Sequence, residues 1–237
     1  GTVSHIRRVN NPLSDSAKIR APHTLHLSSY GIMCPSETPD GARIGLRKNI
    51  SLFANISSGT SSFILMRLLH KMGLISLSEA FLFKNKYCQI FLNGRFVGNI
   101  SNPVTTFQKL KLLKRNAFIN IYTSITWDIL KNRIIISTDS GRGVRPVFVV
   151  KNKKLLVTSN KIKNDWFKLV FGKSRNFNEI TDTDPLYYDT DLSIEDLEKN
   201  QGVIEYIDSD ESNMSLIAMN QKQLRKNTNY DYCEIHP

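Results

Sequence analysis

The spacing of hydrophobic and polar residues changes along the chain. Residues 1–62 contain short apolar pieces separated by turn-forming stretches such as NNPLSDS, CPSETPDG and SSGTSS. Proline, glycine and clustered small polar residues interrupt both the helical and the strand period. We therefore expect this segment to consist of loops with few regular elements.

Helical spacing follows in two places. Apolar residues recur with a helical period from Phe63 onward, which predicts a helix over 63–72 and a turn at Gly73. A second helix is predicted to begin at Pro103, whose fixed φ suits a first turn. Its period places Phe107, Leu110, Leu113 and Lys114 on one face, and Lys109, Lys111 and Arg115 on the other.

Alternating apolar residues predict strands between and after these helices. Asn93-Gly94 separates two apolar runs, and this dipeptide is the strongest short signal for a β-hairpin. Further strands are predicted within residues 117–128, 132–139, 141–150 and 154–159. Residues 82–160 should thus form a small α+β unit.

The C-terminal third is predicted to add one helix and one strand. Ser193, followed by Glu195 and Asp196, resembles a capped helix start, and the helix should end before Gly202. The stretch GVIEYID then predicts a strand. The expected fold class is α+β, in three ranges: loop-rich residues 1–62, a mixed α/β lobe over 63–160, and an acidic helix–strand segment over 161–237.

Composition restricts the class of protein. Hydrophobic residues make up 41% of the 237 residues, enough for packed cores, while no run of eighteen apolar residues or signal-peptide pattern is present. We expect an intracellular globular chain without a membrane partner. Cys34, Cys88 and Cys233 lack paired spacing, so neither a disulfide framework nor a metal site is predicted.

Charge is distributed unevenly. Residues 1–175 contain 28 Lys and Arg against 7 Asp and Glu, whereas residues 176–237 contain 4 against 14. A polyanion is the simplest external counter-charge for such a basic segment, and nucleic acid is the default candidate. A coding bias toward lysine could account for part of the excess, but it does not explain why the acids collect at the other end.

Four separated stretches, in this order, carry a family resemblance: SHIRRVNNPL; CPSETPDGARIGLRKNISL; FLNGRFVGNI with STDSGRGVRPVFVV; and GVIEYIDSDESNMSLIAM followed by YCEIHP. Together they resemble the second-largest, beta-type subunit of multisubunit DNA-directed RNA polymerases. The details are most similar to the eukaryotic, archaeal and viral branch, polymerase II type. Since the chain begins at Gly1 and stops at Pro237, we expect it to be a piece of that subunit, covering its fork and external regions.

The resemblance implies roles for residues near the active centre. In the family the Pro/Gly-rich loop lies beside the growing RNA end, so Arg43 and Lys48 are candidates for phosphate contact. Glu37 would orient a cation or an amide, and Gly41 would allow close backbone approach; alternatively Glu37 and Asp40 cap turns. Arg7 and Arg8 match the paired fork arginines, for which nucleic-acid contact and an internal salt bridge both remain open.

A second group of residues is expected to be structural. Asp139, Arg142 and Arg145 should form an ion-pair and turn network that ties the external lobe to the rest of the chain. Phosphate binding by the arginines is the alternative.

The implied function is transcription of DNA into RNA by a nucleotidyltransferase complex. No catalytic, metal or cofactor residue is expected in this piece, and Mg²⁺ would be held by the largest subunit. The expected partners are that subunit, the other subunits, the DNA template and the nascent RNA. The setting would be the nucleus, or the host nucleus, cytoplasm or virion for a virus. The alternative function is a stand-alone, non-catalytic nucleic-acid-binding protein.

Overall fold

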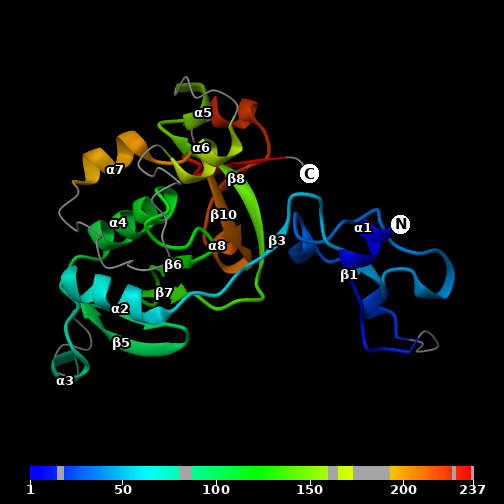
Figure 1. Cartoon of the computed structure of the whole chain (residues 1–237), viewed down its shortest axis with the longest axis horizontal. Helices are drawn as coiled ribbons and strands as arrows, with labels where there is room; N and C mark the ends of the chain where they lie inside the picture. Colours follow the sequence, from blue (N-terminus) through cyan, green and yellow to red (C-terminus); the bar gives the residue numbers. More distant parts are fainter. Residues whose placement is uncertain (15–18, 81–86, 160–164, 173–192, 226–227, 236–237) are drawn as a thin grey trace.

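A computed structural model describes residues 1–14, 19–80, 87–159, 165–172, 193–225 and 228–235. Figure 1 shows a large body, built mainly of green to red segments, and a separate blue N-terminal unit (residues 1–53) beside it. The end of the chain returns toward this unit. The predicted fold class, α+β, is confirmed.

The N-terminal unit is held together by backbone hydrogen bonds rather than by long elements. Cys34 N donates to Asn49 O at 2.8 Å, and Ser51 N donates to Ile32 O at 2.9 Å. The prediction of loops with few regular elements is confirmed. The short elements are α1 (Thr2–Ile6), β1 (Arg8–Val9), η1 (Ala21–His23), η2 (Leu27–Ser29), η3 (Gly41–Arg43) and β2 (Lys48–Asn49), with β1 antiparallel to β2.

A four-stranded sheet with the order β5-β4-β7-β6 forms one half of the body. Asn93 (φ 49°) and Gly94 (φ 76°) both take left-handed backbone angles, as a two-residue hairpin turn requires, so the predicted hairpin is confirmed. β4 pairs with β5 on one side and runs parallel to β7 on the other. The strands are β4 (Cys88–Leu92), β5 (Arg95–Ile100), β6 (Ser124–Asp128) and β7 (Arg133–Ser137).

Two helices pack against this sheet through their apolar positions. In α2 (Ser62–Lys71) the Ser61 hydroxyl accepts from Phe63 N at 3.3 Å, and Gly73 at φ +90° follows the C-terminus, as predicted. α4 (Pro103–Arg115) begins at the predicted proline. The short α3 (Leu77–Ala80) lies beside β5. The shared core includes Leu65, Leu69, Ile90, Leu110, Ile125 and Ile134.

A second sheet is centred on β8 (Gly143–Lys151) and joins strands from all three predicted ranges. β10 pairs along one side of β8, and β3 and β12 share the other side. Pro146 is accommodated because, counted along β8, the pairing with β3 stops at Val144 and the pairing with β12 starts only at Val147. The other strands are β3 (Asn55–Ile56), β9 (Lys154–Leu155), β10 (Ile204–Asp208), β11 (Ile217–Ala218) and β12 (Tyr232–Glu234).

Short helices connect the later strands of this sheet, and one of them, α7, packs against α4. The predicted helix cap is confirmed, because Ser193 Oγ accepts from Asp196 N at 3.2 Å at the start of α7. The predicted strand of residues 202–208 is confirmed as β10. The helices are α5 (Leu156–Ser159), α6 (Trp166–Phe171), α7 (Ile194–Asn200), α8 (Ser209–Asn213) and η6 (Gln221–Arg225).

Two strand predictions were too long. The strand predicted over 117–128 begins only at Ser124, because Ala117 has a left-handed backbone (φ 55°) and Asn120 forms a turn with Tyr122 and Thr123. The strand predicted over 154–159 ends at Leu155, where α5 begins. Within the described ranges, no helix is long and apolar enough to cross a membrane.

Candidate nucleic-acid interface

The short β1–β2 pair brings the SHIRR segment and the Pro/Gly-rich loop together. Arg8 lies opposite Asn49, and Val9 lies opposite Lys48. The Asn49 side chain donates to Glu37 O at 2.9 Å. The two segments that carry the predicted site residues therefore form one structural unit.

The Arg7 side chain donates hydrogen bonds to backbone oxygens of the same chain. Its Nε donates to Ile50 O at 3.4 Å, and its Nη2 donates to Ser51 O and, at 3.4 Å, to Ala54 O. These carbonyls belong to residues 50–54, which directly precede β3. Arg7 thus holds the SHIRR segment to residues 50–54 through backbone oxygens, and among the described residues it forms no salt bridge.

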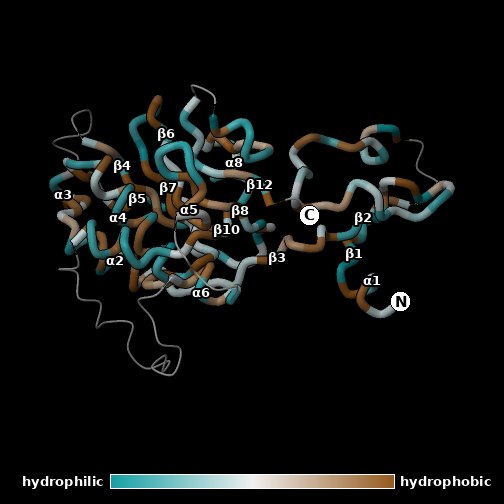
Figure 2. Tube along the Cα trace, turned by 90° about the horizontal axis from the view of Figure 1, so that it is seen from above, coloured by the Kyte–Doolittle hydropathy of each residue, from teal (hydrophilic) through white to brown (hydrophobic). Residues whose placement is uncertain are grey.

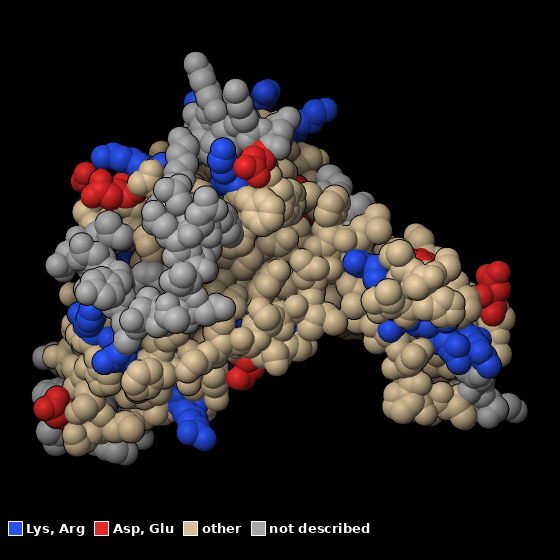
Figure 3. All heavy atoms as spheres, viewed as in Figure 1, with Lys and Arg blue, Asp and Glu red and all other residues tan. Residues whose placement is uncertain are grey.

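Arg8 points to a different environment. It lines a polar hollow of about 350 Å³ with Arg47, His5 and the side chains of Asn10 and Asn11. No carboxylate belongs to the lining residues that the structure describes, and no hydrogen bond or ion pair joins the Arg8 side chain to a described residue. Two guanidinium groups among amide and imidazole groups suit an anion with several oxygen atoms, such as a phosphodiester. In the view of Figure 3 the N-terminal unit carries a group of Lys and Arg atoms.

The two predicted acids of the loop are exposed. Glu37 Oε1 accepts from Ser4 Oγ at 2.7 Å, which ties the loop to α1. Asp40 is the N-cap residue of η3, but its side chain accepts no capping hydrogen bond. Arg43 is exposed at the end of the same turn, and Lys48 is partly buried in β2.

Glycines shape the loop for internal contacts. Gly41 has φ +80°, and a Cβ added there would have no atom within 4 Å. Gly45 has φ +74°, and a Cβ there would lie 2.3 Å from the carbonyl oxygen of His23. The close approach at Gly45 is therefore made by another part of the chain, whereas Gly41 is required by the turn itself.

Arg142 is the centre of a network that joins the two sheets. Its Nη1 donates to Asp208 Oδ2 at 2.7 Å, and its Nη2 donates to Tyr122 O at 2.7 Å. Asp139 takes part through its carbonyl oxygen, which accepts from Arg142 Nε at 3.1 Å and from Ser57 Oγ at 3.2 Å. The carboxylate that pairs with Arg142 thus comes from Asp208, a residue that the sequence did not indicate.

Arg145 connects the body to the N-terminal unit. Its guanidinium donates to the Glu234 carboxylate and, at 3.3 Å, to Ser212 Oγ, and it lies 5.5 Å from the ring centre of Tyr30. A Cβ at Gly31 would lie 2.5 Å from Cδ of Arg145, so glycine leaves room for this side chain.

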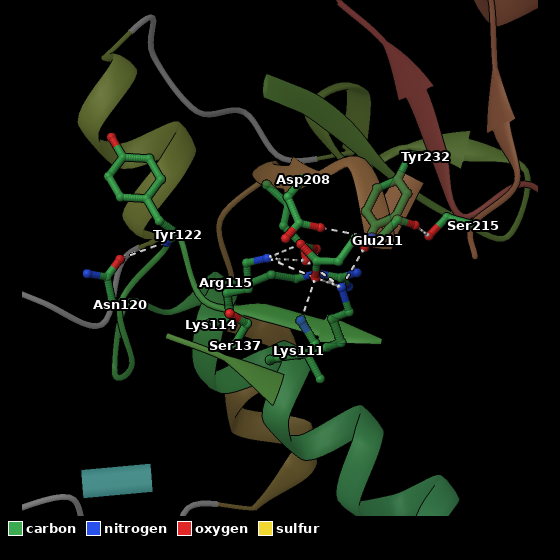
Figure 4. A network of polar contacts seen from close by, with 12 residues as sticks. Lys111, Lys114, Arg115, Asn120, Tyr122, Ser137, Asp208, Glu211, Ser215 and Tyr232 are labelled. Carbon is green, nitrogen blue, oxygen red and sulfur yellow. Dashed lines mark hydrogen bonds and ion pairs between the residues drawn. The ribbon is translucent and has the colours of Figure 1, made fainter. Parts of the chain in front are cut away.

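A buried charge cluster lies between α4, β10 and α8. Figure 4 shows Lys111 and Lys114 extending from α4 toward Glu211. Lys111 Nζ lies 2.5 Å from Glu211 Oε1 and 3.0 Å from Glu205 Oε1, and Lys114 Nζ lies 2.8 Å from Glu211 Oε2. Arg115 Nε donates to Glu205 Oε2 at 2.7 Å. The prediction that Lys111 lies on the face opposite Phe107 and Lys114 was wrong, because Lys111 and Lys114 reach the same Glu211 carboxylate and Lys111 lies over the Phe107 ring.

The cluster shifts the pKa values of Lys111, Glu205 and Tyr232. Burial favours neutral Lys111, but the carboxylates of Glu205 and Glu211 raise its pKa well above its ordinary value. Burial also favours the protonated form of Glu205, yet Lys111 and Arg115 lower its pKa below the ordinary range. Burial, followed by Glu205, raises the pKa of Tyr232 to about 12. At neutral pH Lys111 is therefore a cation, Glu205 a carboxylate and Tyr232 a neutral phenol.

The sequence carried a partial signal for this cluster. Lys111 and Lys114 flank Leu112 and Leu113 in the predicted helix, and Glu205 lies within a hydrophobic strand. What the sequence could not show is that these sites meet. Among the residues with described positions, no group of His, Cys, Asp or Glu could hold a metal ion.

Comparison with known families extends this picture. Three family models match in chain order: RNA polymerase Rpb2, domain 3 over residues 1–56, domain 4 over residues 90–151, and domain 5 over residues 195–237. The chain belongs to the family of second-largest RNA polymerase subunits. The family resemblance seen in the sequence is confirmed. One match falls in each of the three predicted ranges, and the boundaries between the ranges stay a prediction.

Relatives from eukaryotes and archaea match over almost the whole chain. DNA-directed RNA polymerase II subunit RPB2 of Encephalitozoon cuniculi is 38% identical over 245 residues, and DNA-directed RNA polymerase II subunit 2 of Arabidopsis thaliana is 32% identical over 246; both matches cover all of this chain. DNA-directed RNA polymerase subunit Rpo2 of Sulfolobus acidocaldarius is 29% identical over 99% of the chain. The chain spans about a fifth of the length of these relatives, with 20%, 19% and 20% covered.

Proposed function

We propose that the chain serves as part of the second-largest subunit of a DNA-directed RNA polymerase, the nucleotidyltransferase complex that transcribes DNA into RNA. The observation that carries this proposal is the match to three consecutive Rpb2 domains in the family's order. The partners in this proposal are the largest subunit, the other polymerase subunits, the DNA template and the nascent RNA.

In this proposal the chain positions nucleic acid and does not carry out the chemical step. Polymerases join nucleotides by two-metal phosphoryl transfer, for which carboxylates must converge on the ions. Within the described part of the chain no such group is present. We therefore assign Mg²⁺ and the catalytic carboxylates to the largest subunit.

The hollow around Arg8 is our candidate for a phosphate contact. Arg8 and Arg47 offer two planar donor groups without a competing carboxylate among the described lining residues. Arg43, exposed on the same loop, and Lys48, in the neighbouring strand, are further candidates. The Glu37 carboxylate accepts a hydrogen bond from the Ser4 hydroxyl. We therefore assign Glu37 and Asp40 to shaping the loop rather than to proton transfer.

The competing function is a stand-alone nucleic-acid-binding protein. The relatives named above are all polymerase subunits, and this favours the polymerase proposal. An intracellular setting, the nucleus for a cellular eukaryote, follows from the same proposal.

The test uses a polymerase whose second-largest subunit contains this sequence, assembled on a synthetic DNA–RNA scaffold. The Arg8→Ala substitution should shorten the lifetime of the elongation complex. It should also reduce the slope of log stability against log salt by about 0.7–0.9, the value expected for one lost phosphate contact. Arg95→Ala, which removes an exposed arginine of β5, is the matched control and should leave both quantities unchanged.

Two results would count against the proposal. An unchanged salt slope for Arg8→Ala would remove Arg8 from the interface while leaving subunit membership intact. Failure of the sequence to assemble with the largest subunit, together with tight salt-dependent binding of RNA by the isolated chain, would favour the stand-alone function.

A further inference from the structure

The outer edge of β6 is an open strand edge. β6 is the last strand of the four-stranded sheet and pairs with β7 on its inner side only. Ile125 N donates to Glu211 Oε1 at 3.1 Å, so Ile125 turns its backbone groups away from β7. Backbone direction alternates in an antiparallel pair, so Trp127 turns its N–H and C=O outward as well. Within the described ranges the backbone N–H of Trp127 has no hydrogen-bond acceptor.

A groove of about 390 Å³ runs along this edge. Its near wall includes Ile125, Thr126 and Trp127, and its far wall includes Met214 and Tyr232. β6 and α8, which precedes Met214, lie side by side in both Figure 1 and Figure 2. The groove therefore lies between the outer edge of β6, in the four-stranded sheet, and residues that follow α8 or belong to β12 of the second sheet.

The borders of the groove are unusually apolar for a surface. Ile129 is 71% exposed and Met214 is 59% exposed, and both line the groove. The neighbouring Leu130 and Leu216 are 99% and 54% exposed. Large apolar side chains gathered on both sides of an open strand edge are typical of a surface that another chain covers.

Two polar features indicate what the covering segment carries. The indole Nε1 of Trp127 is buried and lacks an acceptor among the described residues. Lys111 and Arg115 line the groove, as does Glu211, and they belong to the cluster in which Lys111, Lys114 and Arg115 share the two carboxylates of Glu205 and Glu211. Asp231 also lines the groove, and its Oδ2 accepts a hydrogen bond from Leu216 N at 2.9 Å. An additional carboxylate would balance the buried cations.

We propose that the outer edge of β6 binds an extended segment of another polypeptide, which adds a strand beside Trp127. Its apolar side chains would pack on Ile129 and Met214, and an acidic side chain between them would face Lys111 and Arg115. Backbone pairing would supply affinity, and the alternating side chains would supply specificity. This surface lies apart from the hollow around Arg8, and the inference does not depend on the proposed function.

The test selects binders from a random library of peptides of roughly ten residues, long enough for one strand, displayed on phage. The target is the chain with Trp166→Phe, so that Trp127 is its single tryptophan. Selected peptides should alternate apolar residues around an aspartate or glutamate, and their binding should shift Trp127 fluorescence. Met214→Lys should weaken binding at least about tenfold, as truncation of a central contact does.

Leu52→Lys is the matched control, because Leu52 is an exposed aliphatic residue in the N-terminal unit, at 79% exposure against 59% for Met214. It should leave binding unchanged. Replacing the selected acid by lysine should weaken binding by a similar factor, and Trp127→Phe should weaken it through loss of the indole N–H. The inference is overturned if no selected peptide is sensitive to Met214→Lys, or if the sensitive peptides are cationic. It is also overturned if the chain dimerises in solution and Met214→Lys abolishes the dimer.

Discussion

The guanidinium of Arg145 donates to the carboxylate of Glu234, 89 residues further along the chain, and both side chains are nearly fully buried. Glu234 in β12 lies opposite Val147 in β8, two positions after Arg145. Side chains two positions apart share one face of a strand, so this pair is a diagonal contact across the two strands. Through Tyr30 the same guanidinium also contacts the N-terminal unit.

Removing one partner of this pair should be costly. Arg145→Met leaves Glu234 buried without its counter-charge, and the expected loss in the free energy of unfolding is about 3–5 kcal/mol. Urea denaturation of the full chain measures this loss. The double variant Arg145→Met with Glu234→Gln should lose less than the sum of the single variants, and strict additivity would contradict a direct interaction.

The charge cluster makes a similar prediction for Glu211. Its carboxylate accepts from Lys111, Lys114 and Ile125 N, and its side chain is 1% exposed. Glu211→Gln keeps the shape but removes the charge, so about 3–5 kcal/mol of stability should be lost. Glu198→Gln breaks the ion pair with Lys151, in which the lysine side chain is 46% exposed and the glutamate side chain is 40% exposed. This change should cost less than about 1 kcal/mol of stability. Equal losses of stability for the two variants would contradict the burial of Glu211 in the charge cluster.

The two loop glycines should respond differently to alanine. At Gly41 the added Cβ meets open space, so Gly41→Ala should cost only the left-handed backbone penalty of about 1–2 kcal/mol. At Gly45 the Cβ would also collide with the carbonyl of His23, so Gly45→Ala should cost clearly more. Thermal or urea unfolding compares them. Equal costs would mean that His23 moves away freely.

Acid should destabilise the chain through two buried carboxylates. The pKa of Glu205 is lowered by its cations, and the pKa of Asp208 is lowered by the N–H of Glu211 and by Ser124 and Arg142, in each case against burial. Groups with lowered folded pKa values stabilise fully above their unfolded values of about 4.3 and 3.9, and this stability disappears as the pH falls through the folded values.

The measurement is the free energy of unfolding in urea between neutral and acidic pH. It should be nearly constant down to about pH 5 and fall below about pH 4. Asp208→Asn should be less stable at neutral pH and should show a shallower acid dependence. A slope unchanged by this substitution would show that Asp208 does not contribute. Lys111, with its raised pKa, should contribute stability that is lost only in strong alkali.

Local signals in the sequence predicted much of the fold. Asn93-Gly94, Pro103 and Ser193 each act on their immediate neighbours, so the hairpin and both helix starts were recognisable without knowledge of distant contacts. The failures have the opposite cause. The Lys111 side chain is buried because of carboxylates that lie 94 and 100 residues away, and no local pattern encodes that meeting.

The candidate site was predictable in its membership but not in its geometry. The sequence motifs indicated both arginines of SHIRR. The partners of Arg7 are backbone carbonyls, and because every residue has one, residue types could not predict which would accept from Arg7. Only the pairing of β1 with β2 explains why Arg8 shares its hollow with Arg47. Asp208 and Glu234, the carboxylates that pair with Arg142 and Arg145, come from the C-terminal range, for which the sequence predicted a helix and a strand but not these pairings.

The position of β8 has a consequence for synthesis of the chain. A ribosome releases β8 well before β10 and β12, so both long ladders on this strand must wait for the last part of the described chain to emerge. Until then, within the described ranges, its backbone has only the two-residue strands β3 and β9 to pair with. Nascent chains halted before Ile204 should therefore be retained by chaperones, while release of the C-terminal strands should free them.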